Sequence, residues 1–215
     1  RELVVGCLSQ MIMARAHNIR SGWKSIFMVF TYVAPGNQQA IVFLAYQMQE
    51  KIMAEYFGLI AGSFFIECVE CLASFASNRN FKEVSIRAIE SIGFCAEQLA
   101  TGRVLPQEED SPTKELVFTT EEVHLRHWLP ILAGLAHIVS HPHIDVRTSA
   151  LDRLFNILLK YGNLFSADLW DLVFHQVLLS LFHDVLATVG SSEGQLMHTS
   201  EWVTSTCLGA LGHMI

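Results

Sequence analysis

The pair Cys68-Val-Glu-Cys71 has the spacing of a C-x-x-C motif, which in other proteins serves redox chemistry or metal binding. As a redox motif it should open a helix after a strand, and as half of a zinc site it needs a second pair. Here the pair lies inside a helical apolar pattern, with Val69, Leu72 and Phe75 close by, and the sequence contains no second pair. We therefore expect Cys68 and Cys71 to be buried structural thiols.

Three histidines, His137, His141 and His143, have a spacing that could place two imidazoles on one face of a helix for a metal ion. Pro142 breaks that helix, and no cysteine or acidic residue clusters beside the histidines in the sequence. We expect capping or surface roles for them. The sequence also contains no Walker-type loop, no G-x-G-x-x-G, no H-E-x-x-H and no G-x-S-x-G motif, so we expect neither catalysis nor a cofactor.

The charge balance disfavours nucleic acid as a partner, because 14 basic residues stand against 21 acidic ones. One small basic group stands out, formed by Arg15, Arg20 and Lys24. Arg20 and Lys24 are four residues apart and would share a helical face if the helix extends that far. They could contact an anionic membrane or an acidic partner, or they could be ordinary solubilising charge.

Nearly every segment that could position these residues has an apolar period near 3.6, and no period-2 strand pattern occurs. The periodicity predicts helices over 2–16, 22–34, 38–56, 64–77, 81–100, 120–140, 145–161, 167–188 and 201–214. Helix starts are predicted from capping residue types at Ser21, Asn37, Ser63 and Asn80, the last with Glu83 in capping-box spacing. Trp23 begins the apolar stripe of the second helix, and we expect it to anchor the first helix pair.

A repeat links these helices, because a β-branched residue followed four positions later by alanine recurs at Ala45, Ala88 and Ala150. The recurrences are separated by 43 and then 62 residues, and the polar, breaker-rich segment 101–119 could hold the excess. A period of about 40–47 residues with two helices per unit is typical of HEAT and armadillo repeats. We therefore predict an all-α, HEAT/armadillo-like solenoid of about four helix pairs spanning 1–215, with flexible loops at 101–119 and 190–200.

The tripeptide Asp145-Val-Arg147 supports this register, because HEAT-type repeats often carry it at the start of their second helix. We expect Asp145 to cap that helix and Arg147 to bridge to a neighbouring repeat.

The chain is rich in apolar residues, which make up 51% of it, yet no apolar run reaches the roughly 18 residues that a membrane span needs. A segment of a longer helical solenoid explains this hydropathy, since its interior helices bury two faces. The five cysteines are odd in number and lie in apolar patterns, which is typical of a reduced, cytoplasmic protein.

The segment Asn18–Phe30, together with the preceding Arg1–Ile12, resembles the first conserved region downstream of the catalytic domain in large Arf guanine-nucleotide exchange factors. The resemblance is to the brefeldin A-inhibited, trans-Golgi type. It continues at Ser85–Ala96, at Trp128–Leu132 and at Asp145–Leu151, in the same order along the chain.

This resemblance implies a HEAT-type regulatory segment of a peripheral Golgi protein whose separate catalytic domain acts on Arf GTPases. It implies roles in autoinhibition, membrane recruitment or binding of Arf/Rab-family small GTPases or other domains of the same factor, and no catalytic residue carries over to this chain. Two other classes stay open: a generic HEAT/armadillo scaffold that binds a protein or peptide, and an enzyme of all-helical fold.

Overall fold

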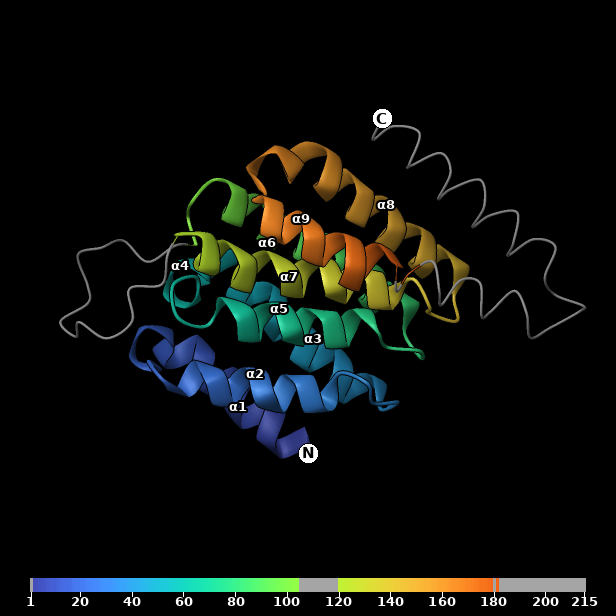
Figure 1. The fold of residues 1–215 in the computed structure, drawn as a ribbon. Coiled ribbons are helices and arrows are strands. Elements are labelled where there is room, and N and C mark those ends of the chain that lie inside the picture. The colour runs from blue at the N-terminus through green and yellow to red at the C-terminus, as the bar shows by residue number, and fades with distance from the viewer. Residues whose placement is uncertain (1, 105–119, 180, 182–215) are drawn as a thin grey trace, which may run out of the picture.

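The computed structural model describes residues 2–104, 120–179 and 181, with the side chains of 120–124 excepted. The predicted helix at 201–214 and the predicted loop at 190–200 lie outside the described residues, as does the loop at 101–119 beyond residue 104. Figure 1 shows the helices stacked from α1 and α2 at one end of the molecule to α8 and α9 at the other.

The helices follow the amphipathic pattern closely, and the described residues contain no strand. The long helices are α1 (Glu2–Arg15), α2 (Gly22–Val33), α3 (Gln39–Glu55), α5 (Phe65–Ala76), α6 (Lys82–Ala100), α7 (Thr120–Ile138) and α8 (Ile144–Tyr161). Shorter elements are a 3-10 turn (Ala16–Asn18), α4 (Phe57–Ile60), a second 3-10 turn (Gly162–Leu164), α9 (Ala167–Leu172) and a π-helix (Val173–Leu178). The first seven predicted helices agree with the structure to within two residues at each end. The short α4 was not predicted, and the helix predicted over 167–188 becomes a π-helix after Leu172.

The helices form two layers that run side by side through the molecule (Figure 1). In one layer α2 packs on α5, α5 on α7, and α7 on the π-helix; in the other α1 packs on α3, α3 on α6, and α6 on α8. The hairpin pairs α2–α3, α5–α6 and α7–α8 join the layers. This arrangement confirms the predicted all-α helical repeat.

The core is made by the apolar stripes of these helices, because each stripe faces a neighbouring helix. Trp23 is 1% exposed, and its ring stacks on that of Phe27 with centroids 6.2 Å apart. Ala45, Ala88 and Ala150 are all fully buried and lie on successive helices of one layer, α3, α6 and α8. Their role as anchors, with that of Trp23, stays a prediction.

The position predicted for the N-cap of α2 is right, but the N-caps of α3, α5 and α6 are each displaced by one residue. Ser21 stands at the N-cap of α2, but its backbone is helical (φ −61°, ψ −15°) and its side chain makes no capping bond. The N-cap positions of α3, α5 and α6 are instead Gln38, Phe64 and Phe81, each one residue after a predicted cap and each without a side-chain bond. Apolar contacts with neighbouring helices thus set these starts more than local capping does.

A polar network links the turns inside successive hairpins, and we call this side of the molecule the loop edge (residues 34–38, 77–81 and 139–143). The buried Asn78 side chain donates from Nδ2 to the carbonyls of Ala34 (2.5 Å) and Gly36 (3.1 Å). Its Oδ1 accepts from the backbone N–H groups of Asn80 (2.8 Å) and Phe81 (2.9 Å). One side chain therefore ties the second hairpin to the first and also satisfies two N–H groups at the start of α6.

The third hairpin joins the loop edge through His141, which is buried. Its Nε2 lies 2.9 Å from the Asn78 carbonyl, and its Nδ1 accepts from the His143 N–H at 3.2 Å. Burial lowers the pKa of His141, the hydrogen bond to Asn78 partly opposes that shift, and the nearby His143 and Arg79 lower the pKa further. A neutral imidazole protonated on Nε2 satisfies both bonds.

The capping role predicted for Asp145 needs correction, whereas the bridge predicted for Arg147 stays a prediction. The N-cap of α8 is His143 without a side-chain bond, and Asp145 lies inside the first turn. Asp145 forms an ion pair between repeats, to Lys82 at 2.9 Å, and this contact lowers the pKa of Asp145 and raises that of Lys82. Arg147 donates to the His141 carbonyl within its own repeat at 3.2 Å. Asp145 does not cap α8 because it lies two positions after His143, the residue at the N-cap position.

Candidate interaction surface

The predicted basic group lies at the corner where α1 turns into α2, and we call residues 15–24 the basic corner. Arg15 ends α1, the 3-10 turn follows, and Arg20 adopts φ +48° immediately before α2 begins at Gly22. That left-handed conformation is uncommon for a residue with a Cβ atom. Arg20 is therefore outside the helix, and the expectation that it shares a helical face with Lys24 is wrong.

The three basic side chains of the corner differ in their surroundings. Lys24 forms an ion pair with Glu67 of α5 at 3.5 Å, with side chains 72% and 26% exposed respectively, so it also helps to hold α2 against α5. Arg15 and Arg20 are exposed. Arg15 borders a hollow of about 290 Å³ that includes His17 and Tyr56, whose rings meet edge to face at 6.3 Å. The partner Glu67 was not predicted, because only the fold brings it beside Lys24.

Cys68 and Cys71 are buried, as predicted, and so is Cys95, whereas Cys7 is exposed. Gln49, also buried, donates from Nε2 to Cys68 Sγ at 3.2 Å and accepts at Oε1 from Cys71 Sγ at 3.7 Å. Burial raises the pKa of the Cys71 thiol and that of the Cys95 thiol. These thiols therefore stay protonated and serve as core residues, since the thiolate is the nucleophilic and metal-binding form.

The histidines do not form a site of their own. His137 is exposed on α7, whereas His141 and His143 belong to the loop edge with ring centroids 5.4 Å apart. In the part of the chain that the structure describes, no group of three or more histidine, cysteine or acidic residues is placed to hold a metal ion.

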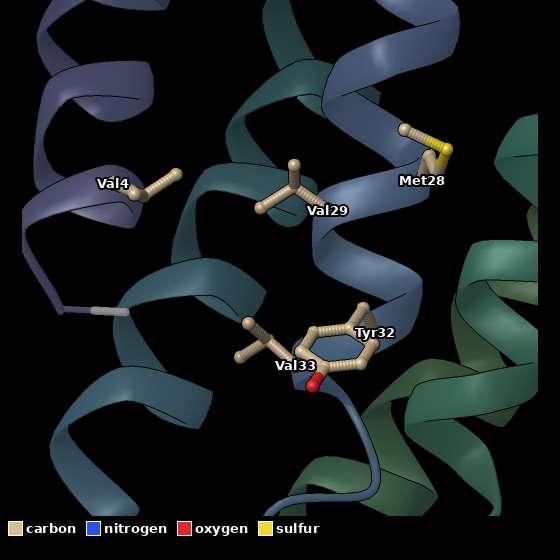
Figure 2. Close-up of a pocket in the computed structure, with 5 residues that line it drawn as sticks. All are labelled: Val4, Met28, Val29, Tyr32 and Val33. Atoms are coloured by element: carbon tan, nitrogen blue, oxygen red, sulfur yellow. The ribbon is translucent and has the colours of Figure 1, made fainter.

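A second surface feature is a concave apolar region of about 410 Å³, which we call the apolar hollow. It is lined by Val4 of α1 and by Met28, Val29, Tyr32 and Val33 of α2. Figure 2 shows Val4 reaching toward α2, with Met28 and Tyr32 following one another along α2. The hollow was not predicted, although the sequence contains a signal for it: apolar residues surround α1 on all sides, which is unusual for a helix with an exposed face.

Comparisons with known proteins agree with this arrangement. Residues 1–51 match a family model described as "Mon2/Sec7/BIG1-like, HDS", and residues 128–212 match one described as "GBF1-like, tetratrico peptide repeat region". Brefeldin A-inhibited guanine nucleotide-exchange protein 2 of Arabidopsis thaliana is 36% identical over 98% of this chain. Brefeldin A-inhibited guanine nucleotide-exchange protein 1 of Mus musculus is 34% identical over the same share. The chain is homologous to a segment of the brefeldin A-inhibited guanine nucleotide-exchange proteins.

The match is to a small part of those exchange proteins. The chain spans 14% of the length of the Arabidopsis exchange protein and 11% of that of the mouse exchange protein. The matched segment lies outside their catalytic domain. No solved structure matches the chain. None of the described helices is both long and apolar enough to cross a membrane.

Proposed function

We propose that the chain is a non-catalytic regulatory segment of a large guanine-nucleotide exchange factor that acts on Arf-family GTPases in Golgi vesicle trafficking. The supporting observation is the similarity to brefeldin A-inhibited exchange proteins along 98% of the chain, in a segment outside their catalytic domain. The proposal places the chain in the cytoplasm, peripheral to the trans-Golgi membrane. It treats residues 1–215 as a single helical-repeat segment.

We propose three means of regulation: autoinhibition, membrane recruitment and binding of an Arf- or Rab-family GTPase or of another domain of the same factor. The basic corner is the proposed contact, because anionic membranes and small-GTPase surfaces both offer acidic counterparts. Arg15 and Arg20 are better placed for this than Lys24, whose charge is partly satisfied by Glu67.

The ion pair between Lys24 and Glu67 makes Lys24 unsuitable for a test of the proposal. Lys24→Glu would place two carboxylates together, beside Glu67, and would disturb the contact between α2 and α5. The double variant Arg15→Glu/Arg20→Glu leaves that contact intact. A matched control is Arg79→Glu/Lys160→Glu, which makes the same change in net charge at exposed positions away from the basic corner.

The first measurement is co-sedimentation with anionic liposomes, with and without GTP-loaded Arf. We expect Arg15→Glu/Arg20→Glu to bind several-fold more weakly than the control, and wild-type binding to weaken with salt. The second measurement is the exchange rate of the full-length factor with and without this segment. If deletion changes neither the exchange rate nor recruitment, the regulatory function is refuted. If deletion has an effect but Arg15→Glu/Arg20→Glu leaves binding unchanged, the basic corner is not the contact.

A further inference from the structure

We draw no further inference here: the strongest candidate, the polar hollow of about 520 Å³ that Asp145, Asp152, Arg153 and three neighbouring polar residues line on the outer face of α8, carries nothing, because its mixed charges favour no single class of ligand and nothing in the structure shows what covers it.

Discussion

At the scale of single residues, His141 shows how burial and hydrogen bonding together select one protonation state. The neutral ring donates from Nε2 to the Asn78 carbonyl and accepts at Nδ1 from the His143 N–H. A second proton would sit on Nδ1 and oppose the His143 N–H group, so the protonated ring loses one of its two bonds. Burial, which is the largest cause of the lowered pKa, acts in the same direction.

This lowered pKa predicts that the third hairpin is held less firmly in acid. Below the ordinary pKa of 6.5 the unfolded chain takes up a proton at His141 before the folded chain does, so stability falls as the pH falls. The uptake of one proton changes the free energy of unfolding by at most about 1.4 kcal/mol per pH unit. Urea unfolding at pH 7.5, 6.5 and 5.5 should therefore show the advantage of the wild type over His141→Gln shrinking with decreasing pH. His137→Gln, at an exposed position, is the control, and an advantage that stays constant for His141 would contradict the assignment.

At the scale of elements, the sequence predicted the helices well because their positions follow from burial of apolar stripes. The stripe Trp23, Ile26, Phe27 and Phe30 is buried almost completely, and α2 begins at the predicted residue. The capping residues failed because a side-chain cap contributes little beside such burial. Local sequence also could not show that Asn78, 44 residues from Ala34, would bond to its carbonyl.

The recurrence of Ala45, Ala88 and Ala150 predicts that a larger side chain at one of these positions disturbs helix packing. Ala88 of α6 is fully buried in a helix that packs against α3, α5, α7 and α8. Ala88→Leu should force these neighbours apart and lower the free energy of unfolding by about 1–3 kcal/mol. The control Ala54→Leu, at an exposed position on α3, should change it by about 0.5 kcal/mol or less. Urea denaturation measures both, and a neutral Ala88→Leu would show that the alanines do not set the repeat register.

At the scale of the whole molecule, the sequence predicted a solenoid and a positive N-terminal corner, but not the surface beside that corner. Arg15 and Arg20 could be identified from residue type alone, and the structure leaves them exposed. The apolar hollow could not be identified in this way, because Val4 and Met28 meet only after α1 and α2 fold onto α3. Apolar residues in a helical pattern are usually assigned to the core, and only the packing shows which of them remain outside it.

The loop edge has a mechanical consequence. Asn78 and His141 hold three hairpin turns together along one side of the molecule. This side, the spine, should therefore be stiff, and when the solenoid bends, the distances between repeats should change mainly on the opposite side. Pairs of spin labels on genetically encoded residues can measure this, one pair at Asn37 and Ser140 on the spine and the other at Ser63 and Asn163 on the opposite side. The spine pair should give the narrower distance distribution, and Asn78→Ala should broaden it, whereas Asn80→Ala, which removes one exposed bond, should not. Equal widths of the two distance distributions in the wild type would mean that both sides of the solenoid are equally flexible. A partner bound at one end could then bend it in any direction.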